Sequence, residues 1–118
     1  MDLNEKVVVI TGATGEIGRA TVEAFLREGS YLALLDYNYD ALVEISEQLG
    51  LNQVSSLLIK VDITSETEVK NAFRQVVDAV WMLRLSLLIF QVHSNTRGKF
   101  QIIYYLKLSV VEKRKLIS

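Results

Sequence analysis

The sequence has no cysteine and no proline, and only one histidine. Without cysteine the chain can form neither disulfide bonds nor thiolate metal sites, and we expect no metal centre. The absence of thiols fits a reducing compartment, so we expect a cytoplasmic protein. Thirteen basic and 14 acidic residues give a net charge of −1. This balance gives no reason to expect binding to nucleic acid or to a membrane surface.

Long hydrophobic segments are also missing. The most apolar stretch, residues 79–92, contains Arg84 and is too short to span a bilayer. Met1 is followed by polar residues, which differ from the charged and then apolar start of a signal sequence. The 118 residues, 50% of them hydrophobic, are enough for one small domain. We therefore expect a soluble protein with no membrane partner.

Apolar runs alternate with helical patterns over the first 90 residues. Runs near residues 6–11, 30–36, 56–62 and 85–91 are typical of strands buried on both faces of a parallel sheet. Between them, apolar residues recur three and four apart, which predicts three helices. The predicted stripes are Ile17, Ala20, Thr21, Ala24 and Phe25; Leu42, Ile45 and Leu49; and Val69, Ala72, Phe73, Val76, Val77 and Val80.

This alternation predicts an α/β fold, a three-layer, Rossmann-like, doubly wound parallel sheet. Right-handed crossovers would place the first two helices on one face and the third on the other, which gives the strand order 3-2-1-4. The carboxyl ends of these strands then share one rim of the sheet. We expect any site to lie on that rim, beside the first strand.

Residues 11–18, TGATGEIG, join the first strand to the first helix. Glycine permits positive φ and close approach of a ligand to the backbone, and the first N–H groups of a helix bind phosphate. A glycine turn between a strand and a helix is the setting that a dinucleotide-binding loop requires. We therefore predict a cofactor site that includes Gly12, Thr14, Gly15, Glu16, Ile17 and Gly18. The alternative is a tight turn that binds no ligand.

Two acidic residues follow the second and third strands. Asp36 lies about twenty residues beyond the loop, where a carboxylate can accept hydrogen bonds from ribose and repel a 2′-phosphate. We therefore expect NAD rather than NADP, and we add Asp36, Tyr37, Asp62 and Ile63 to the predicted site. The alternative role for Asp36 is a helix cap or turn ahead of Asn38. For Asp62 the alternative is also capping, since Ser-x-x-Glu at 65–68 is a capping box.

These residues resemble the cofactor-binding half of the short-chain dehydrogenases/reductases over residues 1 to about 80. The three glycines match the TGxxGxxG of the extended members, whereas the TGxxxGxG of the single-domain members would need glycine where Glu16 stands. Asp62-Ile63-Thr64 is similar to the family's Asp-Val/Ile-Thr, whose aspartate approaches adenine. The resemblance implies NAD-dependent oxidoreductase ancestry. In an empty site the Glu16 carboxylate would interact favourably with the helix dipole, but it would repel a bound pyrophosphate.

The resemblance weakens after residue 80. Arg84–Phe90 is similar to the family's fourth strand, but the Asn-Asn-Ala-Gly that should follow is absent. The resemblance implies an acid-base pair Tyr-x-x-x-Lys, and no tyrosine here has lysine at that interval. Four places after Tyr104 stands Leu108, and four places after Tyr105 stands Ser109. His93, which we expect in a loop, has no acidic or thiol partner nearby in sequence. We predict no catalytic residue.

The predicted organisation is a truncated NAD(P)-binding Rossmann-like domain at residues 1–90, followed by a diverged tail at residues 91–118. The β-prone composition of the tail leaves open an added strand. Three functions stay open. The chain is an NAD-binding fragment that is not catalytic by itself, a minimal oxidoreductase with unrecognised residues, or a structural or interaction protein that binds no cofactor. An exposed apolar surface would recruit a partner or a second copy of the chain.

Overall fold

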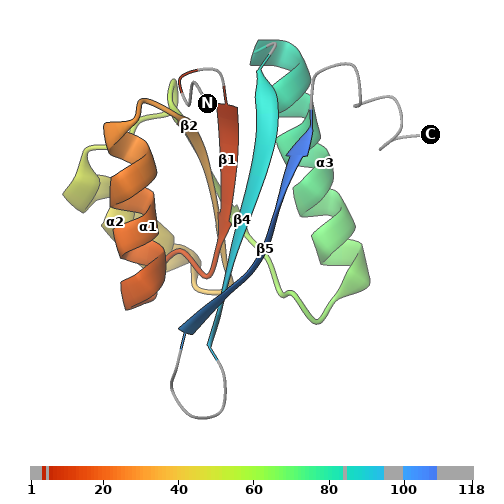
Figure 1. Cartoon of the computed structure of the whole chain (residues 1–118). Helices are drawn as coiled ribbons and strands as arrows, with labels where there is room; N and C mark the ends of the chain where they lie inside the picture. The colour runs from red at the N-terminus through yellow and green to blue at the C-terminus, as the bar shows by residue number, and fades with distance from the viewer. Residues whose placement is uncertain (1–3, 5, 84, 95–99, 109–118) are drawn as a thin grey trace.

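The computed structural model describes residues 4, 6–83, 85–94 and 100–108, and the side chains among them up to Leu85. Five strands and three helices alternate as Figure 1 shows. In chain order they are β1 (Lys6–Thr11), α1 (Glu16–Arg27), β2 (Tyr31–Asp36), α2 (Tyr39–Leu49), β3 (Ser56–Lys60), α3 (Glu66–Leu83), β4 (Ser86–Ser94) and β5 (Phe100–Leu108). The predicted α/β alternation is confirmed.

The strands form one sheet with the order β3-β2-β1-β4-β5. β1 pairs in parallel with β2 and with β4, and β2 pairs in parallel with β3. The first four strands therefore form the parallel sheet that the sequence predicts, with β1 at its centre. The carboxyl ends of β1, β2 and β3 lie at the same edge of this sheet.

The segment after residue 90 differs from the simplest expectation in two ways. β5 lies within the predicted tail and pairs antiparallel with β4, so the sheet is mixed rather than wholly parallel. β4 itself continues to Ser94, which places His93 in a strand opposite Gln101 rather than in a loop. The loop expectation for His93 is therefore wrong, because pairing with β5 extends the strand beyond its apolar run.

Helices cover both faces of the sheet, α1 and α2 on one face and α3 on the other (Figure 1). Side chains alternate between the two faces along a strand, so β1, β2 and β3 each face two separate cores. The core under α1 and α2 contains Val8, Ile10, Ala13, Val22, Leu32, Leu34, Leu42 and Ile45. The core under α3 contains Val7, Val9, Ala33, Leu35, Ile59, Val61, Ala72, Val76 and Val80. The predicted three-layer arrangement is thus confirmed.

The predicted stripe of α2 is confirmed, because Leu42 and Ile45 are buried and Leu49 packs against them. The predicted stripe of α1 is wrong in its phase. Its buried residues are Gly18 and Val22, with Phe25 and Leu26 partly buried beside them, whereas Ile17, Ala20 and Ala24 are exposed. In α3 only Val69 departs from the prediction. It is 40% exposed and lies in the first turn of the helix, ahead of Ala72, the first residue of α3 in the core.

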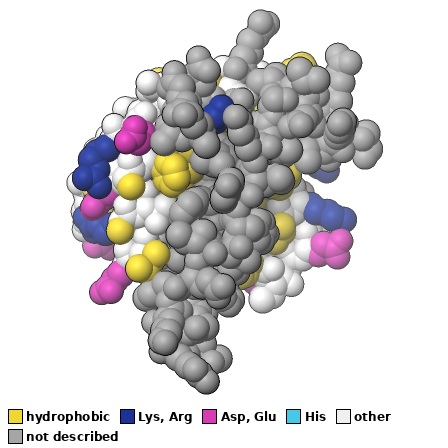
Figure 2. Space-filling model, in the orientation of Figure 1, with side chains coloured by type: hydrophobic (Ala, Val, Ile, Leu, Met, Phe, Trp, Pro, Cys, Tyr) yellow, Lys and Arg dark blue, Asp and Glu magenta, His cyan; other side chains and the backbone are white. Residues whose placement is uncertain are grey.

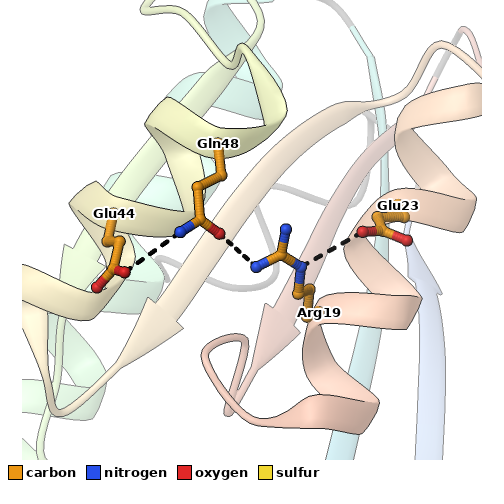
Figure 3. A network of polar contacts seen from close by, with 4 residues as sticks. All are labelled: Arg19, Glu23, Glu44 and Gln48. Atoms are coloured by element: carbon orange, nitrogen blue, oxygen red, sulfur yellow. Dashed lines mark hydrogen bonds and ion pairs between the residues drawn. The ribbon is translucent and has the colours of Figure 1, made fainter.

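Polar contacts join the outer surfaces of α1 and α2 (Figure 3). The Arg19 guanidinium donates through Nη1 to Gln48 Oε1 and through Nε to Glu23 Oε1, and Gln48 donates in turn to Glu44. Acidic and basic side chains lie side by side on this flank of the molecule (Figure 2). Exposed pairs of this kind contribute about 0–1 kcal/mol each, so the apolar cores provide most of the stability. None of the described helices is both long and apolar enough for a membrane span.

Candidate functional site

The loop after β1 is held against the end of β2. Gly12 has a φ of 65°, the left-handed region that glycine adopts most readily. Its N–H donates to the Leu35 carbonyl at 3.0 Å, and the N–H of the buried Ala13 reaches the same oxygen at 3.5 Å. The loop therefore turns directly at the strand end and lies next to Asp36.

Gly18 is required by close packing. An added Cβ would lie 2.1 Å from the Gly12 carbonyl oxygen and 2.8 Å from the Ala13 Cα, both backbone atoms. No L side chain fits at that distance without a shift of the backbone. The contact explains the phase of α1, because it places Gly18 and the residues one and two turns later, Val22 and Phe25, against the sheet.

Gly15 has neither of these requirements. Its φ of −75° and ψ of 169° are open to any residue. An added Cβ would meet nothing closer than the Gly12 carbonyl oxygen at 3.7 Å, an ordinary contact. Within the described chain, no steric or backbone requirement therefore explains glycine at this exposed position.

Gly15 is also the N-cap of α1, and no side chain caps the helix there. The first bond of the helix runs from the Arg19 N–H to the Gly15 carbonyl at 2.8 Å. The N–H groups of residues 16–18 accordingly have no acceptor within the helix. Glu16 and Ile17, in the first turn, are both exposed, Ile17 by 36%. Free N–H groups at a helix start attract anions, whereas the Glu16 carboxylate adds negative charge there.

Asp36, the last residue of β2, connects the loop with the start of α2. Its Oδ2 accepts from the Thr14 N–H at 3.1 Å and from the Thr14 hydroxyl at 2.7 Å. Its Oδ1 accepts from the Asn38 N–H at 3.2 Å. Asn38, not Asp36, caps α2 by accepting from the Ala41 N–H. Of the alternatives for Asp36, the turn contact is observed and the helix cap is not.

Asp62 follows β3, and the Val61 N–H donates to the Asp36 carbonyl at 3.0 Å, which keeps the two strand ends together. The Asp62 Oδ1 accepts from the Thr64 hydroxyl at 2.6 Å and from the Thr64 N–H at 2.9 Å. The hydroxyl bond, followed by the backbone bond, lowers the pKa of Asp62 below its ordinary value of 3.8. The Asp62 carboxylate is therefore ionised at neutral pH.

The capping box after Asp62 forms only in half. Ser65 Oγ accepts from the Glu68 N–H at 3.3 Å, as the sequence predicts. The Glu68 carboxylate, however, accepts from the Asp62 N–H at 3.2 Å. It therefore fixes the backbone at Asp62, while the Asp62 side chain stays directed to its own turn at Thr64.

Five predicted site residues from separate segments line one cavity of about 250 Å³: Gly12, Asp36, Tyr37, Asp62 and Ile63. Leu35 and Val61 complete its wall. Whole small-molecule sites occupy about 300–1,000 Å³, so this cavity is large enough for one part of a larger ligand. Tyr37 and Ile63 are 66% and 68% exposed, which leaves apolar surface at the rim. Gly15, Glu16 and Ile17 lie outside the wall, at the start of α1.

Sequence reasoning missed three features of this region. Leu35 and Val61 line the cavity, and their positions next to the two aspartates are the signal that could have indicated them. Lys60 places its Nζ 5.6 Å from the centroid of the Tyr37 ring, a cation–π distance. The bonds from Thr14 to Asp36 span 22 residues, and no local pattern predicts them. The described residues contain no cluster of potential metal ligands.

The replacement Thr64→Val should raise the pKa of Asp62 toward 3.8, because it removes the hydrogen bond from the Thr64 hydroxyl, the larger cause of the lowering. A depressed carboxyl pKa adds stability above the unfolded-state pKa, and that stability is lost as the pH falls through the folded-state value. The variant should therefore lose part of this contribution at neutral pH. NMR titration of the Asp62 carboxyl carbon measures the shift, with Thr67→Val as the control. An unchanged titration in Thr64→Val would contradict this cause.

A parallel sheet with a glycine turn after its central strand, and acids after the next two strands, defines a Rossmann-type nucleotide-binding fold. The sequence profile of the short chain dehydrogenase family matches residues 6–101. The chain therefore belongs to the short chain dehydrogenase family of oxidoreductases.

Individual relatives agree with this assignment. The 15-hydroxyprostaglandin dehydrogenase (NAD(+)) of Homo sapiens is 38% identical over 103 residues, which make up 86% of this chain and 38% of that protein. The NAD-dependent glycerol dehydrogenase of Listeria innocua is 32% identical over 75 residues, 64% of this chain and 28% of that protein. The chain thus spans well under half the length of these relatives.

Solved structures match the same part of the fold. A short chain dehydrogenase/reductase from Burkholderia phymatum in complex with NAD aligns with a TM-score of 0.60 and 26% identity, over 67% of this chain and 28% of that one. An NAD+-bound xylitol dehydrogenase aligns with a TM-score of 0.59 and 34% identity, over 67% of this chain and 30% of that one.

Proposed function

We propose that the chain binds NAD at the Gly12–Gly18 loop and in the adjoining cavity, and that it does not transfer hydride by itself. The conformation of Gly15 carries this proposal. Gly12 needs its positive φ and Gly18 needs its close packing, but nothing within the described chain requires glycine at 15. A diphosphate that approaches the backbone would require the absence of a side chain there.

Each part of the cofactor has matching residues. The free N–H groups at the start of α1 would hold the pyrophosphate. Asp36 would accept from the adenosine ribose, and the cavity between Asp36 and Asp62, with its Leu35 and Val61 wall, would hold the adenine. The NAD-bound structures of two similar proteins support NAD as the cofactor. When bound, NAD would supply a nicotinamide that accepts hydride.

We assign cofactor binding to a domain of residues 1–90. We also propose that the protein is cytoplasmic. The proposed lack of catalysis rests on the missing Tyr-x-x-x-Lys pair. Tyr104, Tyr105 and Lys107 all fall in the strand β5 and not in a helix. A tyrosine and a lysine one helical turn apart, which the acid-base step of this family needs, are therefore not available there.

Replacing Asp36 with alanine tests the proposed cofactor specificity. We expect NAD affinity to fall about tenfold, because hydrogen bonds to a charged group contribute about 1.5–3 kcal/mol. NADP should lose less affinity, since its 2′-phosphate no longer meets a carboxylate. Calorimetric titration of both cofactors measures the two changes, and Asp40→Ala, which removes an exposed acid from α2, is the control. An unaltered ratio of NAD to NADP affinity in Asp36→Ala would refute the assignment.

Replacing Glu16 with glycine should tighten the binding of either cofactor by about two- to fivefold. A charge at a helix terminus contributes about 0.3–1 kcal/mol, and this one opposes the pyrophosphate. Glu16→Gln separates charge from size, and Glu47→Gln removes one exposed carboxylate from α2 as the control. If Glu16→Gly binds NAD no better than the unmodified chain, the pyrophosphate does not lie beside this turn.

A further inference from the structure

Two donors from one residue converge on a single oxygen of Asp36. The backbone N–H and the side-chain hydroxyl of Thr14 lie 3.1 Å and 2.7 Å from Oδ2, in a partly buried contact. Each bond is charge-assisted, the kind that is shorter and stronger than a neutral pair. Thr14 is therefore bound to Asp36 through its N–H, and this N–H is not directed to a phosphate in the loop.

These bonds leave the carboxylate little freedom. An aspartate carboxylate offers about four lone-pair positions. Thr14 occupies the two on Oδ2, and the Asn38 N–H occupies one on Oδ1. One position on Oδ1 remains for a ligand hydroxyl. The last torsion of an aspartate is otherwise broad, so a carboxylate without these donors could rotate away from an approaching anion.

We propose that Thr14 is a positioning residue that sets the preference for NAD over NADP by fixing the Asp36 carboxylate. The proposal rests on the NAD-binding function proposed above. A ribose 2′-hydroxyl can donate to the remaining position on Oδ1. A 2′-phosphate would meet a negative charge that three donors hold in place. Thr14 thus acts on specificity through Asp36, without a cofactor contact of its own hydroxyl.

Removal of the hydroxyl separates this role from a purely structural one. Thr14→Val keeps the shape of the side chain and loses its donor, whereas Thr14→Ser keeps the donor. Thr14→Ala removes the hydroxyl in a second way, should valine impair folding. Thr21→Val is the matched control. It also removes a threonine hydroxyl that donates a hydrogen bond, but this bond goes to the Ile17 carbonyl within α1, at 2.8 Å, and not to Asp36.

The experiment measures the dissociation constants of NADH and NADPH by nicotinamide fluorescence, on the whole chain and each variant. We expect the ratio of the NADPH constant to the NADH constant to fall about threefold in Thr14→Val and Thr14→Ala, because one hydrogen bond is lost and the backbone bond remains. The ratio should be unchanged in Thr14→Ser and Thr21→Val. In an Asp36→Ala background, Thr14→Val should no longer alter it.

An unchanged ratio in Thr14→Val and Thr14→Ala overturns the inference and leaves NAD binding intact. The same threefold fall in the Asp36→Ala background also overturns it, because the effect would then not pass through Asp36. If the unmodified chain binds NADH and NADPH equally, no preference exists for Thr14 to set. If it binds neither, the proposed function itself fails, and the inference fails with it.

Discussion

Replacing Gly18 with alanine should lower the free energy of unfolding by about 3 kcal/mol, near the upper end of the usual cost of overpacking. The added Cβ would lie 2.1 Å from the Gly12 carbonyl oxygen and within 3.0 Å of two Ala13 backbone atoms. Because these neighbours are backbone, no side chain can move aside to make room. Either the loop or the first turn of α1 must shift, and both belong to the proposed pyrophosphate site. Urea denaturation followed by circular dichroism measures the loss.

Gly15→Ala is the matched control for this prediction. The same methyl group would lie 3.7 Å from the Gly12 carbonyl oxygen on an ordinary backbone conformation. We expect Gly15→Ala to lose about 1 kcal/mol or less of unfolding free energy, because glycine is favoured over alanine at the N-cap of a helix. If the two alanine variants lose equal stability, the different roles assigned to these glycines are wrong.

Hydride transfer by the purified chain should be undetectable above the uncatalysed rate. A positioned acid or base contributes about 10²- to 10⁴-fold to such a reaction, and the chain lacks the tyrosine–lysine pair that moves the alcohol proton in this family. Bound NAD alone would bring a nicotinamide to the sheet edge but provide no partner for that proton. The tyrosines that the assay tests as substitutes are Tyr104 and Tyr105, both in β5.

The assay incubates the chain with NAD and a panel of secondary alcohols and follows the absorbance of NADH. The double variant Tyr104→Phe, Tyr105→Phe is run beside it. Turnover that disappears in the double variant would refute the prediction and favour the minimal oxidoreductase. Absence of turnover in both, with NAD binding retained, supports a binding role.

Most of the fold could be predicted because the apolar runs are unambiguous. β1 and β2 are buried on both faces, and such strands show as continuous apolar runs in the sequence. α2 has a local signal at each end, since the Asn38 side chain caps it and Gly50 ends it with a φ of 69°. Both kinds of signal depend only on residues close together in the sequence, so they can be recognised without knowledge of the tertiary structure.

The errors arise where distant segments decide the outcome. The phase of α1 depends on the contact of Gly18 with Gly12 and Ala13, and a glycine at an interface adds nothing to an apolar stripe. The small residues Ala20, Thr21 and Ala24 have the spacing of a buried face but not the bulk. The antiparallel pairing of β5 with β4 could not be predicted either, because a β-prone run indicates neither its neighbouring strand nor its direction in the sheet.

The candidate site was predictable in its residue types but not in its contacts. Glycines and strand-end acids indicated Gly12, Asp36 and Asp62, which the structure brings to one cavity. The bonds from Thr14 to Asp36 depend on the turn of the loop against β2, a tertiary arrangement. The half-formed capping box at Ser65 has the same origin, since Glu68 finds the Asp62 N–H instead of its usual partner.

The most direct test of NAD binding at this loop is a calorimetric titration of NAD into the unmodified chain and into Gly15→Ala. Gly15 is exposed and an added methyl group would make only an ordinary contact, so the variant should keep the fold while it changes the surface offered to the pyrophosphate. We predict saturable binding to the unmodified chain and an affinity at least about tenfold weaker in the variant, as for the loss of a charge-assisted hydrogen bond. No binding to the unmodified chain, or equal affinity in both proteins, would contradict the account.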